Sequence, residues 1–300
     1  MYLPAITIGY AIPNKNFDAT VHSVFRSALN LRLNKKNKLL TLLVSSEADL
    51  PQGIRLDTPD EFSFEKFCVG EQVTCEDKNL RLNSLTIDLH NARRWQCDLS
   101  ALDVDTTTPS FSSAWNFVWD ALNKRQKLSN AEIIAEELFR LDESARANVS
   151  RKVGEAMRDL VHATRRCELS DTSAIKQLIG LGSGLTPTGD DLLVGYLAGL
   201  WCTVQNKIER TQFIACLGKR IIRFSRETND ISRTYLYHAA QGQVSSRLAN
   251  LAEAICSGEN REHLLETAEA AMSVGHTSGM DAVTGLLVGL TVWINPNNPI

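Results

Sequence analysis

The 300-residue sequence lacks a long apolar run and lacks an excess of charge of either sign. No stretch is both free of polar residues and long enough to span a bilayer, which takes about 20 residues. The first ten residues carry no basic segment of the kind that opens a secretory signal peptide. A formal net charge of -3 gives no electrostatic reason to expect nucleic-acid or membrane binding. We therefore expect a cytoplasmic protein with neither kind of partner.

Recognisable cofactor motifs are absent as well. The seven cysteines are odd in number and show no metal-ligand spacing, so we interpret them as reduced thiols that mostly serve packing. No P-loop, dinucleotide-binding or zinc-binding motif occurs in the sequence. The sequence thus identifies no cofactor, apart from a cation considered below.

Residues 1–105 predict a β-rich domain. Residues 30–33 and 39–44 flank a polar turn at 34–37, which is the pattern of a β-hairpin. Further short strands are expected over 53–56, 71–75, 80–82 and 85–89. Their regular spacing favours a small barrel or a sandwich. Residues 18–28 fit a helix or a strand, and the pattern does not decide between them.

A polar segment at 103–110 predicts a linker, and the period of the apolar residues changes from two to that of a helix beyond it. Helices are expected over 111–124, 131–139, 143–165, 172–178, 189–204, 209–226, 231–240, 245–256, 262–272 and 279–293. The predicted fold class is α+β: a β-rich barrel-like or sandwich-like domain, followed by an all-helical domain over 110–300.

The most informative stretch is LIGLGSGLTPTGDDLLVGYLAGL at 178–200. Its three leading glycines allow the backbone to turn tightly or to approach a ligand. Thr188 and Asp191 have the spacing of a capping box and predict a helix start, and the apolar residues that follow predict a buried helix. Asp190 and Asp191 are explained either as residues that satisfy the free N–H groups of the first turn, or as part of a functional site.

A second copy of this pattern favours the functional interpretation. Residues 279–290 match 189–200 at six positions, and Ser278 to Asp281 repeats the capping spacing. Each copy carries two glycines four residues apart, which lie on one helix face and permit close helix packing. Two such helices packed together would bring Asp191 and Asp281 toward a common end. A shared polar site between the two preceding loops is therefore predicted.

A third segment, 228–242, carries polar residues in a suggestive order. Thr228 or Asn229 fits the start of a helix, and Ser232 and His238 lie on roughly one face of it. A single histidine on such a helix is more often structural than catalytic. The same argument applies to His276, although its place in a glycine loop favours a functional role more strongly.

Three motifs resemble, in this order, those of the AllH family: GLGSGLTPTGDD at 180–191, YLYHAAQG at 235–242 and GHTSGMD at 275–281. AllH is a subunit of the oxamate carbamoyltransferase of anaerobic allantoin breakdown, and a wider family shares these motifs. The β-rich first part also looks similar. The resemblance implies reversible carbamoyl transfer between oxalurate and phosphate, giving oxamate and carbamoyl phosphate. It also implies an enzyme that is assembled from different subunits.

The residues can be matched to that chemistry. Carbamoyl transfer needs a held NH2 group, a stabilised oxyanion and a clamp for phosphate. Within this hypothesis Asp190 or Asp191 accepts from the NH2 group, and His276 transfers a proton. Loop N–H groups and hydroxyls bind the substrate oxygens. The predicted substrate-binding residues are Gly182, Gly184, Thr186, Thr188, Ser232, Thr277, Ser278 and Asp281.

Two neighbouring carboxylates would repel an anionic substrate. Either a divalent or monovalent cation lies between Asp190 and Asp191, or the phosphate is held elsewhere, with a partner subunit as one source. Two alternatives to a catalytic subunit stay open. One is a non-catalytic assembly subunit whose glycine motifs only build a helix core, and the other is a binding protein for another small amide or carboxylate.

Overall fold

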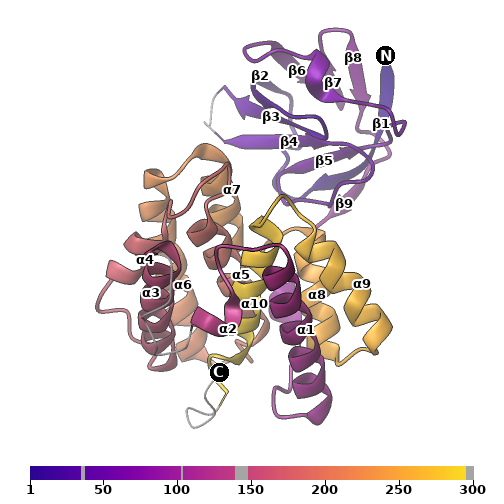
Figure 1. Cartoon of the computed structure of the whole chain (residues 1–300). Helices are drawn as coiled ribbons and strands as arrows, with labels where there is room; N and C mark the ends of the chain where they lie inside the picture. Colours follow the sequence, from indigo (N-terminus) through magenta and orange to yellow (C-terminus); the bar gives the residue numbers. More distant parts are fainter. Residues whose placement is uncertain (35–37, 103, 139–147, 295–300) are drawn as a thin grey trace. The chain divides into compact units, whose positions relative to one another are not determined.

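The computed structural model describes residues 1–34, 38–102, 104–138 and 148–294, and it divides into two compact units, Met1–Cys97 and Asp98–Ile300 (Figure 1). The first unit is built from strands. They are β1 (Tyr2–Gly9), β2 (Phe17–Val24), β3 (Ala28–Leu33), β4 (Leu39–Leu43), β5 (Gly53–Leu56), β6 (Gln72–Glu76), β7 (Asn79–Leu82), β8 (Leu85–Asp88) and β9 (Arg93–Trp95).

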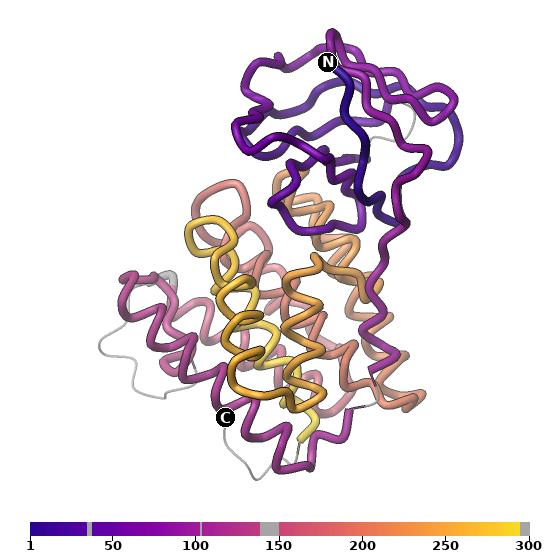
Figure 2. Tube along the Cα trace, turned by 90° about the vertical axis from the view of Figure 1, so that its right-hand side faces the viewer, coloured from indigo at the N-terminus to yellow at the C-terminus, as the bar shows by residue number. Residues whose placement is uncertain are grey.

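The strands of the first unit close into an eight-stranded barrel, with β9 added at one edge of β1 (Figure 2). Strand β1 makes the closure because it pairs on one side with β5, antiparallel, with Ala5 opposite Leu56. On its other side, its first half pairs with β8 and its second half with β9, both parallel. A register irregularity between Ala5 and Thr7 accompanies the change of partner.

The barrel interior is filled by branched apolar side chains that alternate with outward-facing residues. Fully buried examples are Leu29, Leu31, Leu42, Ile54, Leu56, Leu80, Leu82 and Ile87. The predicted α+β class is confirmed, and of its two options for the first unit the barrel is the observed one. The predicted hairpin is the antiparallel pair β3–β4, whose turn residues 35–37 lie outside the described residues.

Two features of the barrel differ from the expectations. Residues 18–28, which the sequence left undecided, belong mostly to β2, paired with β3 and β6. Strands β1 and β9 were not predicted. Strand β1 depends on partners more than 40 residues away in sequence, so its local pattern says little about its role in closing the barrel.

The second unit is helical throughout its described residues. Its helices are α1 (Pro109–Leu128), α2 (Ala135–Leu138), α3 (Asn148–Arg165), α4 (Ser173–Leu178), α5 (Thr188–Cys202), α6 (Ile208–Phe224), α7 (Asp230–Ala239), α8 (Ser246–Ser257), α9 (Arg261–Met272) and α10 (Ser278–Thr291). Each predicted helix is present, although α2 is shorter than expected. The predicted helical residues 139 and 143–147 lie outside the described residues. No described helix is long and apolar enough to cross a membrane.

The polar segment predicted as a linker is tied into the helical unit. A 3-10 turn, η2 (Leu99–Ala101), packs against α5. Thr108 then caps α1, where its hydroxyl accepts from the N–H of Phe111, and Pro109 opens the helix. The boundary between the two compact units thus falls a few residues before the polar segment.

Helices α5 and α10 form the centre of the helical unit and pack side by side (Figure 1). A Cβ built on Gly195 would overlap the carbonyl oxygen of Ala282, and one on Gly285 would overlap that of Leu192. Gly199 and Gly289 make the same kind of backbone approach one turn further on. The residue numbers in contact rise together along both helices, so the helices are parallel and start at the same end. The predicted packing through the glycine faces is confirmed.

This contact yields a stability prediction. Gly195→Ala or Gly285→Ala inserts a methyl group into a backbone-to-backbone contact, and we expect each to lower the free energy of unfolding by about 1–3 kcal/mol. Val194→Leu is the matched control, because Val194 in the same helix is only half-buried. Thermal and urea unfolding measure the effect. Alanine variants as stable as the native chain would show that the glycines are not at a tight contact.

Candidate functional site

Parallel packing brings the starts of α5 and α10, and the loops before them, to one place. The Oγ1 of Thr186 and the Oγ of Ser278 lie 2.6 Å apart and join the two loops directly. Gly182 has a φ of +113°, and a Cβ there would lie 2.8 Å from the N atom of Thr188. Only glycine therefore fits where the first loop folds back over the start of α5. The predicted convergence of the two loops is confirmed.

The two copies of the motif lie against each other in a reciprocal way. The hydroxyl of Ser278, the first residue of α10, lies close enough to Asp191 in α5 to lower the pKa of its carboxyl group. The hydroxyl of Thr188, the first residue of α5, does the same for Asp281 in α10. Thr186 also lowers the pKa of Asp191, and Thr277 lowers that of Asp281. Each carboxyl group therefore has a hydroxyl of the other helix as a neighbour.

This arrangement corrects the predicted capping boxes. The residues at the cap positions are Pro187 and Thr277, and neither helix has a side-chain cap hydrogen bond. Thr188 and Ser278 lie one position inside the helices. The spacing rule considers only a helix and its own first turn, whereas here the hydroxyls lie beside a carboxyl group of the neighbouring helix.

Asp190 has partners that the sequence did not indicate. Its Oδ1 accepts from the backbone N–H of Gly180 (2.9 Å), and its Oδ2 accepts from the Oγ1 of Thr228 (2.6 Å). Thr228 immediately precedes Asn229. Asn229 caps α7 with its side chain, and it is one of the two residues that the sequence offered for the start of this helix. Ser232 in α7 is close enough to lower the pKa of Asp190, yet its buried Oγ has no hydrogen bond of regular geometry.

These residues form one group of buried acids and buried or half-buried hydroxyls, which we call the acid–hydroxyl cluster. Its members are Asp190, Asp191, Asp281, Thr186, Thr188, Thr228, Ser232, Thr277 and Ser278. Asp190, Asp191 and Asp281 are 1%, 9% and 3% exposed, respectively. The Oδ2 of Asp191 is buried without any hydrogen-bond partner. A buried carboxyl oxygen without a partner is costly for folding, which makes this oxygen a candidate contact for a ligand.

Burial dominates the electrostatics of the cluster. It raises the pKa of Asp281 to about 7, against hydrogen bonds from Thr188 and Thr277 that lower it. It raises the pKa of Asp191 well above the ordinary range, and the charges of Asp281 and Asp190 raise it further. Burial also raises the pKa of Asp190, while Thr228 and Gly180 lower it. Near neutral pH the cluster therefore carries less negative charge than three ionised carboxylates.

The remaining predicted residues lie at the surface of the same loops. His276 is exposed, and its ring makes no hydrogen bond within the described part of the chain. Gly184 is exposed with a φ of +96° and open space beside it. Among the described residues, no group of three or more His, Cys, Asp or Glu side chains is arranged to hold a metal ion. The cation between Asp190 and Asp191 stays a prediction.

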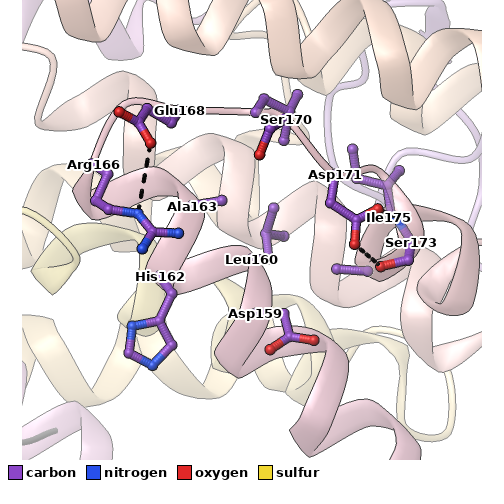
Figure 3. Close-up of a pocket in the computed structure, with 12 residues that line it drawn as sticks. Asp159, Leu160, His162, Ala163, Arg166, Glu168, Ser170, Asp171, Ser173 and Ile175 are labelled. Carbon is purple, nitrogen blue, oxygen red and sulfur yellow. Dashed lines mark hydrogen bonds and ion pairs between the residues drawn. The ribbon is translucent and has the colours of Figure 1, made fainter.

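Two cavities lie elsewhere in the helical unit. One of about 260 Å³ lies beside the end of α3 and α4, where Asp159, His162, Arg166 and Asp171 line it (Figure 3). Its charged groups are partly paired with each other, as in the contact between Arg166 and Glu168 at 3.9 Å. The other, of about 440 Å³, shares Arg166 and extends to α6. Neither is lined by a residue of the acid–hydroxyl cluster.

Fold and site together define an α+β chain whose helical unit holds a buried polar site between two repeated helix starts. The family model described as oxamate carbamoyltransferase subunit AllH matches residues 178–290, which include both repeats. The AllH family N-terminal domain matches residues 4–94, which is nearly the whole barrel. Together they cover more than half of the chain, and the chain belongs to the AllH family. No solved structure matches it.

The raised pKa of Asp281 predicts how stability depends on pH. The folded-state pKa, about 7, lies above the ordinary value of 3.8. The stabilising contribution of protonated Asp281 is therefore complete below about pH 4 and is lost as the pH rises through about 7. We expect the free energy of unfolding to fall by roughly 2–4 kcal/mol between these limits.

Urea titrations of the native chain and of Asp281→Asn across this range measure the dependence. The asparagine variant should show a clearly shallower fall, since its side chain does not titrate. We assign the pH dependence of the free energy of unfolding that remains in this variant to Asp190 and Asp191, whose pKa values are also raised. An equal fall in both proteins, or a rise with pH in the native chain, would contradict the assignment.

Proposed function

We propose that this chain is a subunit of a carbamoyltransferase acting on oxalurate and phosphate, and that the acid–hydroxyl cluster supplies part of its active site. The observation that carries the proposal is the unpartnered Oδ2 of Asp191 inside a buried cluster of acids and hydroxyls. Membership of the AllH family supports the reaction class, since the matched model is described as a subunit of oxamate carbamoyltransferase.

The proposed reaction transfers a carbamoyl group between nitrogen and oxygen. An oxygen of phosphate attacks the terminal carbonyl carbon of oxalurate, which forms a C–O bond and a tetrahedral oxyanion. The C–N bond then breaks, oxamate leaves with a proton on its nitrogen, and carbamoyl phosphate remains. The protein must hold the carbamoyl NH2 group, stabilise the oxyanion and deliver that proton.

The cluster matches the first two of these needs. The free Oδ2 of Asp191 can accept from an NH2 group. The two parallel helices direct the positive ends of their dipoles at the same place, where developing negative charge on the oxyanion is stabilised. For proton transfer there are two groups: Asp281, whose pKa is about 7, and the exposed His276.

The raised pKa values also answer the electrostatic objection to an anionic substrate. A cluster that holds protons near neutral pH repels an anion less than three carboxylates would, so a cation is not required for this purpose. The groups that shift these three pKa values are hydroxyls, a backbone N–H group and carboxyl groups, and the guanidinium of Arg233 contacts the cluster at the backbone oxygen of Thr228. We propose that another subunit of the complex supplies the phosphate clamp.

One alternative is that the glycine motifs serve only assembly with other chains. The glycine faces of α5 and α10 are turned toward each other inside this chain, so they are not available as a contact surface for a partner. A close-packed helix pair also does not account for three buried carboxyl groups at its start. The structure therefore favours a ligand site over a purely architectural role.

The test is phosphate-dependent oxalurate cleavage by the reconstituted complex. Asp190→Asn or Asp191→Asn keeps the size of the side chain but changes its acceptor groups, and we expect at least a tenfold loss of activity, or about 1.4 kcal/mol of transition-state stabilisation. Asp171→Asn is the matched control, because Asp171 is an exposed residue before α4. Thermal melts of each variant check folding. Full activity in both cluster variants would refute the proposal.

A further inference from the structure

We infer that Asp191 and Asp281 act together as one donor–acceptor pair that recognises a primary amide group, and so selects oxamate over the dicarboxylate oxalate. The inference rests on the proposed function for the location of the site. It does not depend on which subunit performs the transfer, because it concerns binding alone.

The carboxyl groups of Asp191 and Asp281 occupy equivalent positions at the starts of the two helices. Asp191 and Asp281 hold the same position in two repeated motifs, at the starts of parallel helices that touch backbone to backbone. Each lies close enough to the hydroxyl of the other helix's first residue for that hydroxyl to lower its pKa, Ser278 for Asp191 and Thr188 for Asp281. They are also close enough for the charge of Asp281 to act on Asp191. Two like acids in such surroundings are expected to share protons instead of both ionising.

Two buried polar atoms show that the cluster is not complete by itself. The Oδ2 of Asp191 and the Oγ of Ser232 are buried without a hydrogen-bond partner. Ser232 lies against Asp190, the neighbour of Asp191, so both unpartnered atoms belong to the same cluster. A ligand that brings its own donor and acceptor would satisfy them.

The protonation state of the Asp191–Asp281 pair determines which ligand groups complement it. One protonated and one ionised carboxyl group offer an O–H donor beside an oxygen acceptor. A primary amide offers the complement, a C=O acceptor beside an N–H donor. A carboxylate of the same shape offers acceptors alone and leaves the ionised partner facing another negative charge. Oxamate carries such an amide, whereas oxalate carries a second carboxylate in its place.

The first loop must open for a ligand to reach this pair, since the carboxyl groups are nearly inaccessible. The contacts that hold it closed are polar. Thr186 contacts Ser278, and the Nδ2 of Asn229 donates to the backbone oxygen of Leu185 (2.9 Å). The N–H of Gly180 donates to Asp190, and the N–H of Gly189 donates to the backbone oxygen of Leu181. Leu185 itself is 58% exposed, so no apolar packing of this side chain opposes the movement.

The pair also makes binding depend on pH. The charged groups that act on it are Asp190 from α5 and Glu132 from the turn before α2, and both favour the protonated state. As the pH rises through about 7, Asp281 loses its proton, and its negative charge helps to keep the proton on Asp191. The pair then offers one donor and one acceptor, so affinity for oxamate should rise with pH through this range.

The experiment is calorimetric titration of the full chain, and of the reconstituted complex, with oxamate and with oxalate between about pH 6 and pH 8.5. We expect oxamate to bind more tightly than oxalate and to gain about tenfold in affinity as the pH rises over this range. Asp281→Asn keeps a donor and an acceptor at every pH, so its oxamate affinity should be nearly independent of pH. Asp171→Asn should reproduce the native profile.

Several results would overturn the inference. They are equal affinity for oxalate, a native profile that does not change with pH, an unchanged pH dependence in a folded Asp281→Asn variant, or no oxamate binding by either the chain or the complex. Thermal melts establish that the variant is folded. Oxamate binding with the expected profile, in a complex that transfers no carbamoyl group, would refute the proposed function while leaving this inference intact.

Discussion

The backbone-to-backbone contact between α5 and α10 is the constraint on which the functional part of this chain depends. Gly195 and Gly285 remove the side chains that would separate the helices, and the second glycine pair one turn later keeps the contact parallel. Parallel neighbours place both positive dipole ends together, beside Asp190, Asp191 and Asp281. The glycine contact therefore gathers three acids at one end of the helix pair.

The same contact determines the chemistry of the acids. It brings the hydroxyls of Thr188 and Ser278 beside the carboxyl groups of the neighbouring helix, and it leaves those carboxyl groups nearly inaccessible to water. Burial then outweighs the dipoles and the hydroxyls, because the pKa values rise in spite of both. The resulting site is weakly charged and rich in hydrogen-bonding groups. Such a site suits a small molecule that carries an amide beside an anionic group.

Much of this organisation could be predicted from the sequence, because it is local or repeated. The helices could be predicted from the spacing of the apolar residues. The packing of α5 against α10 could be predicted from two matching motifs, each with two glycines four residues apart. Long-range partners could not be predicted in this way. The closing strand β1 and the bond from Thr228 to Asp190 join residues far apart in sequence. The capping spacing of Thr188 was also misleading, because its hydroxyl is used by the neighbouring helix.

We propose that the two repeated helix starts form one ligand site. The most direct test is an experimental structure of the chain, alone or in its complex, with oxamate bound. We expect oxamate between Asp191 and Asp281, with its amide group at the Oδ2 of Asp191 and with the loop before α5 displaced from Ser278. Oxamate bound only in the cavity beside α3 and α4, with the acid–hydroxyl cluster unchanged, would contradict it.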